Sequence, residues 1–278
     1  MLVAPPASRF DTSWRSCARL GPTSLIAKRN FARVLGLPED HRDVARVARR
    51  SFRNFAKYVV EIMRFPTLHH DELARIVTVD GWEHLRTAID CGRGLIFVSI
   101  HFGNFEVGGA RIADEIPLNV IADDLDNERL MDFLVGNRAH KNINIHSPAG
   151  AARKVLSALR RNEMVGLMMD LGPRALAFDT VRTTFFGEVT HFPRVAADLA
   201  RVSGAPIVVA AVVRERNNTF RGIALPPIFV ERNGSTAETI RVTDAIARGL
   251  EELITRWPDQ WYIFRPMWPA EKITESVT

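Results

Sequence analysis

From residue 75 onward, short apolar segments alternate with amphipathic ones, and this alternation limits the possible folds of the chain more than any other feature. The apolar segments are typical of strands, near residues 75–79, 94–100, 117–122, 142–146, 164–170, 206–213 and 219–225. The amphipathic segments are typical of helices, near residues 81–90, 104–114, 126–138, 149–161, 191–203 and 236–256. Because such alternation builds parallel sheets through helical crossovers, we expect an α/β fold with a mostly parallel central sheet and helices on both faces.

Two basic amphipathic segments precede this alternation, at residues 23–35 and 39–65. Each combines apolar residues at helical spacing with basic residues on the other side. Two interpretations remain open: the helices pack on the core as ordinary surface helices, or their basic faces lie on an anionic membrane. We predict a loose N-terminus (1–22), a single domain (23–268) in which residues 23–65 form a membrane-facing helical extension, and a tail (269–278).

The composition limits the partners of the chain. The longest apolar runs, near residues 94–100 and 204–213, fall far short of the ~20 residues that a membrane-spanning helix needs, so membrane association is expected to be peripheral. The net charge of +5, carried mostly by arginine, suits an anionic leaflet or an acidic carrier protein. Nucleic acid is not expected as a partner, because 32 acidic residues dilute the charge and no aromatic RNA-binding motif or recognition helix is present.

One histidine stands at the end of a predicted buried strand, in the sequence His101-Phe-Gly-Asn-Phe-Glu106. Open α/β sheets keep their sites at the carboxyl ends of their strands. Glu106 falls in the first turn of the next predicted helix, within reach of one imidazole nitrogen. A carboxylate there fixes the tautomer and supports the imidazolium. His101 and Glu106 are therefore candidates for a general-base pair, worth ~10²–10⁴-fold in rate, and Asn104 between them is a candidate substrate contact.

A second apolar run ends in Asp170, followed by Arg174, at the same expected sheet edge. Asp170 is a candidate for orienting the substrate or the base, and Arg174 for binding a phosphate or a developing oxyanion. The alternative is an aspartate that only begins a turn. No Gly-x-Ser-x-Gly elbow is present, so direct transfer without an acyl-enzyme is the more economical mechanism.

A third region contributes further candidate substrate contacts. Phe185 and Phe186 are candidates for the wall of an apolar channel, with core packing as the alternative. Arg194 stands near the start of the predicted helix 191–203, whose N-terminus favours an anion. An aromatic segment at 256–268 either closes the core or faces a lipid interface. No metal site and no bound cofactor are expected, because the chain has no P-loop, no Gly-x-Gly-x-x-Gly and no metal-ligand spacing.

These motifs resemble a known family. The stretch from His101 to Glu106 resembles the His-x4-Asp/Glu motif of the glycerolipid-type acyltransferases, and is most similar to the bacterial lipid A late acyltransferases and the phosphatidylinositol mannoside acyltransferases. Four more matches follow in order: Asp170-Leu-Gly-Pro-Arg174, Phe185-Phe-Gly187, the helix with Pro193 and Ser203-Gly-Ala-Pro206, and Pro258-Asp-Gln-Trp-Tyr262. The resemblance covers about residues 25–268.

The resemblance implies transfer of a fatty acyl group from a thioester of coenzyme A or acyl carrier protein to a hydroxyl of a membrane glycolipid. It implies a peripheral enzyme at the cytoplasmic face of the inner membrane, with His101 as the base, Glu106 as its partner, and Asp170 and Arg174 in the site. The phosphatidylinositol mannoside acyltransferases have a glutamate two residues before the aspartate that corresponds to Asp170. This chain has Met168 at that position. Either Glu106 alone orients His101, or Asp170 shares that role.

Two other functions stay open on the sequence. One is a lysophospholipid acyltransferase, which would use the same dyad on another acceptor. The other is a lipid-binding protein on the same fold without activity, against which the intact pair of His101 and Glu106 argues, because binding alone needs no oriented base.

Overall fold

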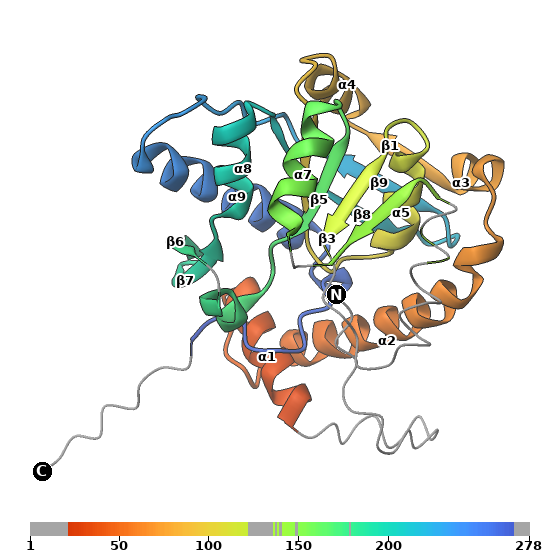
Figure 1. The fold of residues 1–278 in the computed structure, drawn as a ribbon. Helices are drawn as coiled ribbons and strands as arrows, with labels where there is room; N and C mark the ends of the chain where they lie inside the picture. Colours follow the sequence, from red (N-terminus) through yellow and green to blue (C-terminus); the bar gives the residue numbers. More distant parts are fainter. Residues whose placement is uncertain are drawn as a thin grey trace, which may run out of the picture.

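The computed structural model describes residues 22–121, 136, 138, 141–147, 150–177 and 179–269. A seven-stranded sheet forms its centre, in the order β1-β9-β8-β2-β5-β3-β4 (Figure 1). The strands are β1 (Val77–Asp80), β2 (Leu95–Ser99), β3 (Leu118–Ile121), β4 (Ile143–His146), β5 (Met164–Met168), β8 (Ile207–Arg214) and β9 (Phe220–Ala224). All neighbouring strands are parallel except β8 and β9. The predicted α/β fold with a mostly parallel sheet is confirmed.

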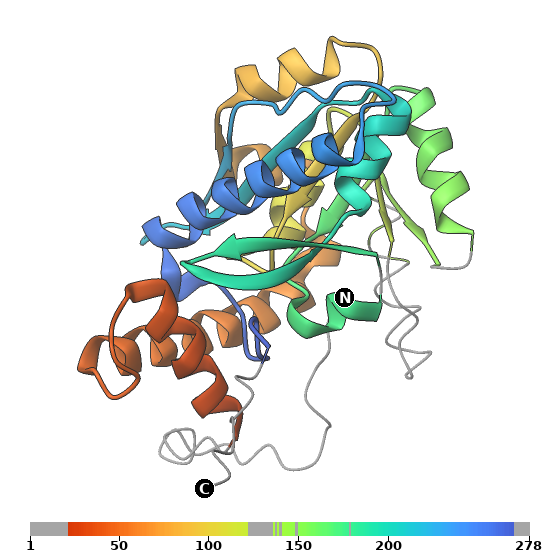
Figure 2. The same ribbon diagram turned by 90° about the vertical axis from the view of Figure 1, so that its left-hand side faces the viewer.

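Helices cover both faces of this sheet (Figure 2). They are α1 (Pro22–Leu35), α2 (Arg42–Arg64), α3 (His70–Ile76), α4 (Trp82–Ile89), α5 (Phe105–Ala113), α7 (Ala151–Arg160), α8 (Val195–Ser203) and α9 (Thr236–Arg256), with short 3₁₀ turns η2 (Phe65–Thr67), η3 (Gly172–Ala177) and η4 (Pro258–Gln260). Side chains alternate between the faces of a strand. In β2, Ile96 and Val98 accordingly join the core under α7, α8 and α9, whereas Leu95 and Phe97 pack in the core under α3, α4 and α5.

A two-stranded hairpin lies outside the central sheet and was not predicted. It consists of β6 (Thr180–Phe185) and β7 (Glu188–Pro193), which pair antiparallel. Burial alternates along β6, a period of two that indicates a strand. The predicted helix 191–203 is therefore wrong at its start: residues 191–193 complete β7, and α8 begins at Val195.

Helices α1 and α2 run side by side past one edge of the sheet (Figure 1). Both hold the C-terminal segment: Asn30 Nδ2 donates to the carbonyl of Arg265 at 2.7 Å, and Ser51 Oγ donates to the carbonyl of Trp261 at 2.7 Å. The interpretation that these helices pack on the core is confirmed for their buried faces.

Three predictions from the sequence concern segments that lie wholly or mostly outside the described residues. The loose N-terminus lies outside the described residues except for Pro22, and the tail lies outside them except for Pro269. Most of the predicted helix 126–138 also lies outside them. The proposed limits of a single domain stay a prediction. Among the helices that the structure describes, none is long and apolar enough to cross a bilayer.

Candidate active site

His101 and Asp170 meet at the carboxyl ends of two neighbouring strands. β2 and β5 are parallel, and their last residues, Ser99 and Met168, are in register. The residue two places beyond each strand therefore reaches the same point. Nδ1 of His101 lies 2.8 Å from Oδ1 of Asp170, a hydrogen-bonded pair. Both residues are buried, with 8% of His101 and 1% of Asp170 exposed.

The carboxylate of Asp170 is held by further donors. Its Oδ2 accepts the backbone N–H of His101 at 3.1 Å and Nε1 of Trp261 at 3.0 Å. Burial acts to raise the pKa of Asp170, but the charge and hydrogen bond of His101, the charge of Arg265 and the bond from Trp261 hold that pKa well below its ordinary value. Asp170 is therefore an anion at neutral pH, able to fix the imidazole and to stabilise its protonated form.

The loop after β2 is shaped by close packing against β8 and the C-terminal segment. Gly103 has a φ of +54°, and a Cβ there would lie 1.7 Å from the carbonyl oxygen of Val212. Its N–H donates to the carbonyl of Gln260 at 2.9 Å, and Tyr262 N–H donates to the carbonyl of His101 at 2.8 Å. A glycine is required at 103, and the C-terminal segment fixes the backbone on which His101 stands.

Glu106 does not orient His101, and this expectation is corrected. The Glu106 carboxylate forms an ion pair with Arg138, whose Nε donates to Oε2 at 3.0 Å and whose Nη2 donates to Oε1. Only 5% of Glu106 is exposed, and a buried carboxylate needs such a cation. Of the two alternatives for the orienting carboxylate, the contact with Nδ1 is made by Asp170.

Asn104 is used within the protein. It caps α5, where its Oδ1 accepts the N–H of Val107 at 3.1 Å. Its Nδ2 donates to Oε2 of Glu61 in α2 at 2.8 Å, and the residue is 1% exposed. Because the side chain is buried and both of its polar atoms bond to other groups of the protein, the geometry favours a structural role.

Arg174 follows Asp170 in the chain and lies on the 3₁₀ turn η3. It is exposed on η3, and its charge acts on Arg265, which in turn donates to the backbone carbonyl of Asp170 at 2.9 Å. Burial lowers the pKa of Arg265, and the charge of Arg174 lowers it further while Asp170 raises it. The predicted role of Arg174 in binding an anionic group of a substrate stays a prediction.

The other three predicted contacts are not brought to the dyad. Phe185 is 1% exposed and packs on Trp268 and Trp261, with ring centres 5.9 and 6.2 Å apart. Phe185 is therefore core, and the expected channel wall is not seen there. Phe186, partly buried in the hairpin turn, packs its ring edge-on against Phe185. Arg194 forms a bidentate ion pair with Asp198, at 2.7 and 3.1 Å.

Helix α2 is joined to the segment that carries His101. Glu61 of α2 pairs with Arg214, whose Nη2 donates to Oε2 at 2.6 Å. Tyr58 packs on Phe105 with ring centres 4.9 Å apart, and Phe105 meets the imidazole of His101 edge-on at 5.5 Å. A displacement of α2 would therefore also shift Phe105 and change the position of the His101 imidazole.

Several of these partners were missed by the sequence reasoning. Trp261 and Arg265 stand in the aromatic C-terminal segment, which was noted, but their contact with Asp170 spans 91 residues or more. Arg138 and Arg214 carry no local signal that links them to Glu106 or Glu61. Only the match Pro258-Asp-Gln-Trp-Tyr262 pointed to Trp261 as more than core.

The dyad suits proton transfer. With Nδ1 held by Asp170, a proton transferred to the ring would go to Nε2, and the resulting imidazolium would lie beside an anion. Within the part of the chain that the structure describes, no group of three or more His, Cys, Asp or Glu side chains is arranged to hold a metal ion.

Known proteins similar to this chain are acyltransferases. Residues 12–269 match the family model for bacterial lipid A biosynthesis acyltransferases. The phosphatidylinositol mannoside acyltransferase of Mycolicibacterium smegmatis is 29% identical over 94% of this chain and 84% of its own length. The protein of the same name from Mycobacterium tuberculosis is 30% identical over 96% of this chain and 83% of its own length.

A solved structure, the 1-acyl-sn-glycerophosphate acyltransferase of Thermotoga maritima, is similar with a TM-score of 0.40 and 15% identity, covering 83% of this chain and 95% of that one. The family model spans almost the whole chain, including the dyad and the C-terminal segment. The chain is an acyltransferase and belongs to the bacterial lipid A biosynthesis acyltransferase family.

Proposed function

We propose that this enzyme moves a fatty acyl group from an acyl thioester to a hydroxyl of a membrane glycolipid, with His101 as general base. The observation that carries the proposal is the buried dyad, in which Nδ1 of His101 lies 2.8 Å from a carboxylate held anionic by its surroundings. A non-enzymatic lipid-binding protein would have no use for an oriented base.

In the proposed reaction, Nε2 of His101 takes the proton of the acceptor hydroxyl while that oxygen attacks the thioester carbonyl carbon. The C–S bond then breaks, an ester remains on the acceptor, and the imidazolium returns its proton to the leaving thiolate. Asp170 stabilises the imidazolium between these steps. Arg174 is proposed to bind the developing oxyanion or a phosphate of a substrate. No acyl-enzyme is formed.

The donor is proposed to be acyl-coenzyme A or acyl carrier protein, and no bound cofactor takes part. The acceptor class rests on the relatives, two of which are named phosphatidylinositol mannoside acyltransferases. A sugar hydroxyl of a lipid-anchored glycoside is the group that this chemistry would acylate.

The enzyme is proposed to bind peripherally to the cytoplasmic face of the inner membrane through α2. Val59, Val60 and Met63 lie on the last turns of that helix and are 41%, 63% and 72% exposed. Lys57 and Arg64 flank them, which supplies the mixture of apolar and basic groups that an anionic leaflet attracts. Binding of vesicles should rise with anionic lipid and fall with salt, and it should weaken in Met63→Glu.

The test of the reaction is an assay of the purified protein with acyl-coenzyme A or acyl carrier protein and either a glycolipid or a lysophospholipid acceptor, with products identified by mass spectrometry. An acylated glycolipid supports the proposal, whereas acylation of the lysophospholipid alone favours the second acceptor class. His101→Ala should abolish transfer while its circular dichroism spectrum matches that of the wild type. An active His101→Ala variant would rule out the mechanism.

A further inference from the structure

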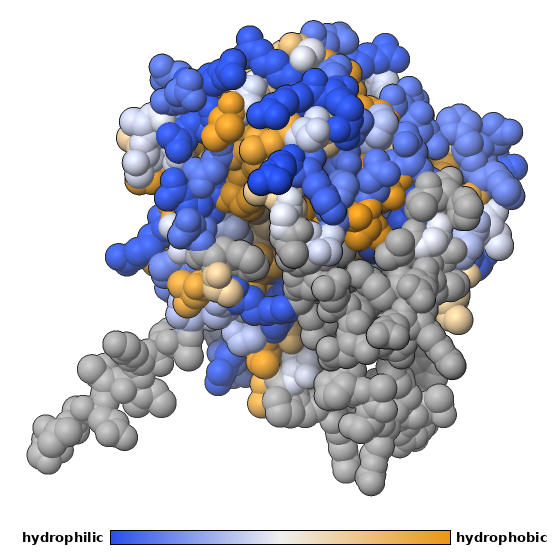
Figure 3. All heavy atoms as spheres, viewed as in Figure 1, coloured by the Kyte–Doolittle hydropathy of each residue, from blue (hydrophilic) through white to orange (hydrophobic). Residues whose placement is uncertain are grey.

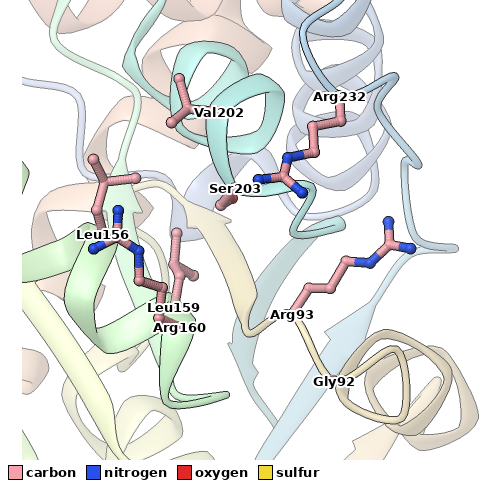
Figure 4. A pocket seen from close by; sticks show the side chains of 8 residues that line it. All are labelled: Gly92, Arg93, Leu156, Leu159, Arg160, Val202, Ser203 and Arg232. Atoms are coloured by element: carbon pink, nitrogen blue, oxygen red, sulfur yellow. The ribbon is translucent and has the colours of Figure 1, made fainter.

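A small hollow lies at the edge of the sheet opposite the dyad. It has a volume of about 210 Å³ and is lined by residues from four segments of the chain, among them Arg93, Arg160 and Arg232 (Figure 4). Arg93 comes just before β2, whereas His101 comes just after it. At about 3.3 Å per residue, the five residues of β2 alone separate the two ends by about 16 Å, so the hollow is not part of the active site.

The arginines approach the hollow from two sides. Figure 4 shows Arg93 and Arg232 on one side, with Arg160 beside Leu156 on the other. Nη1 of Arg93 and Cδ of Arg232 lie 3.4 and 3.7 Å from the point where Gly204 would carry a Cβ, so the two side chains approach each other to within about 7 Å. Gly204 ends α8 with a φ of +77°, the left-handed conformation that favours glycine.

Among the residues that the structure describes, no carboxylate is paired with these three arginines. Across the described part of the chain, none of the three arginines has a hydrogen bond or ion pair to another residue. The neighbouring carboxylate Glu163 is already bound to Arg161 and Asn119. An anion bound in the hollow would be attracted by all three guanidinium groups.

Helix ends near the hollow do not cancel the positive charge. Helices α4, α7 and α8 all end beside it, and the carbonyl end of a helix carries about half a negative charge. Three such ends offset about 1.5 of the three guanidinium charges, so the hollow remains positive.

The size and lining of the hollow indicate the kind of anion. Pockets for drug-sized ligands measure roughly 300–1,000 Å³, so about 210 Å³ suits a phosphate or diphosphate group rather than a whole nucleotide. Leu156, Leu159 and Val202 form an apolar wall, and Figure 3 shows apolar residues between α7 and α8 with hydrophilic ones around them. One guanidinium group can bind two phosphate oxygens at once, so arginine is well suited to bind a phosphate group.

We propose that Arg93, Arg160 and Arg232 form a binding site for a phosphate-bearing ligand, separate from the acyl-transfer site. The site binds the phosphate group through the guanidinium groups, while the apolar wall contacts whatever carbon group is attached. The proposal is independent of the proposed acceptor and donor, because it uses no residue of the dyad.

The test measures binding of sodium diphosphate to the purified full chain by calorimetry and by the shift of its unfolding midpoint, against sodium chloride at equal ionic strength. Saturation at 100 times Kd should raise the ratio of folded to unfolded protein about 100-fold. Arg93→Gln and Arg232→Gln should each weaken binding about tenfold, since each removes a charge-assisted contact. Arg153→Gln, an exposed arginine of α7 outside the hollow, is the matched control.

Acyl transfer should be unchanged in all of these variants, which also shows that they fold. A second experiment measures binding to neutral vesicles with and without phosphatidic acid. If Arg93→Gln and Arg232→Gln lose vesicle binding while the wild type does not bind diphosphate, the phosphate belongs to a lipid headgroup. The proposal is overturned if diphosphate acts no differently from chloride and vesicle binding is equal in all variants. It is also overturned if Arg153→Gln loses as much binding as the hollow variants.

Discussion

Nε1 of Trp261 donates a 3.0 Å hydrogen bond to Oδ2 of Asp170, the carboxylate whose other oxygen holds His101. Trp261 is fully buried and cannot turn away, because Phe31 and Phe185 pack edge-on against its ring. The indole therefore fixes the rotation of the carboxylate, and with it the direction in which Nε2 of His101 points. Trp261 is therefore a positioning residue for His101, the proposed base.

Trp261→Phe should lower kcat/KM about tenfold, because a hydrogen bond to a buried charged group is worth about 1.5–3 kcal/mol and part of it acts in the transition state. KM should change less than kcat. Trp268→Phe is the control, since its Nε1 donates to the carbonyl of Phe185 and not to the dyad. Equal losses in the two variants would mean that Trp261 acts only through packing.

Asp170→Asn should lower kcat/KM by about 10²–10⁴-fold, because an amide can neither hold Nδ1 as an acceptor anion nor stabilise the imidazolium. The surroundings depress the pKa of Asp170, so its carboxyl is ionised from about pH 5 to 9. The measurement compares the initial rates of acyl transfer by the two purified proteins at one slightly alkaline pH, with matching circular dichroism spectra as the control for folding. Wild-type activity in a folded Asp170→Asn variant would rule out Asp170 as the residue that orients His101.

The same pKa shift predicts how stability depends on pH. A carboxyl whose folded-state pKa is depressed contributes stability that is present above its unfolded pKa of about 3.9 and is lost as the pH falls through the lower folded value. The difference in the free energy of unfolding between wild type and Asp170→Asn should accordingly shrink below about pH 4 in urea titrations. A difference that grows on acidification would have the wrong sign.

The strands and helices of the central sheet could be predicted from the sequence because their apolar periodicity is local. The hairpin β6–β7 was missed because residues 191–193 run directly into the amphipathic pattern of α8, which made one long helix the simpler interpretation. A period of two over only six residues is a weak signal beside a longer helical one.

The sequence predicted which residues lie at the site, but not which of them pair with each other. His101 and Asp170 were both placed at the carboxyl edge, which follows from the strand pattern. Glu106 was assigned to His101 because it is near in sequence, yet its ion-pair partner, Arg138, comes 32 residues later. Pairing at a sheet edge depends on strand order, and the neighbouring position of β2 and β5 cannot be read from periodicity.

Glu106→Gln should therefore act on stability rather than on the base. Removing the carboxylate leaves Arg138 mostly buried without its anion, which costs about 3–5 kcal/mol of unfolding free energy when a buried pair is broken. In a cycle with Arg138→Gln, the double variant should lose clearly less than the sum of the single losses. If Glu106→Gln instead folds as stably as the wild type and loses activity as Asp170→Asn does, Glu106 supports the base directly.

Gly103→Ala should prevent folding, or lower the free energy of unfolding by several kcal/mol. A Cβ at this position would lie 1.7 Å from the carbonyl oxygen of Val212, and the backbone there has a φ of +54°. The neighbouring atom is main chain of a central strand, so it cannot move aside as a flexible side chain would. Gly36→Ala is the matched control, because Gly36 has a φ of +61° but no atom within 4 Å of the added methyl group.

The control should cost only the strain of a left-handed alanine, about 1–2 kcal/mol. The difference between the two variants in urea unfolding then measures the contact between the His101 loop and β8 apart from the backbone conformation. If Gly103→Ala proves no less stable than Gly36→Ala, the loop is free to move off β8. The dyad would then not depend on that contact for its position.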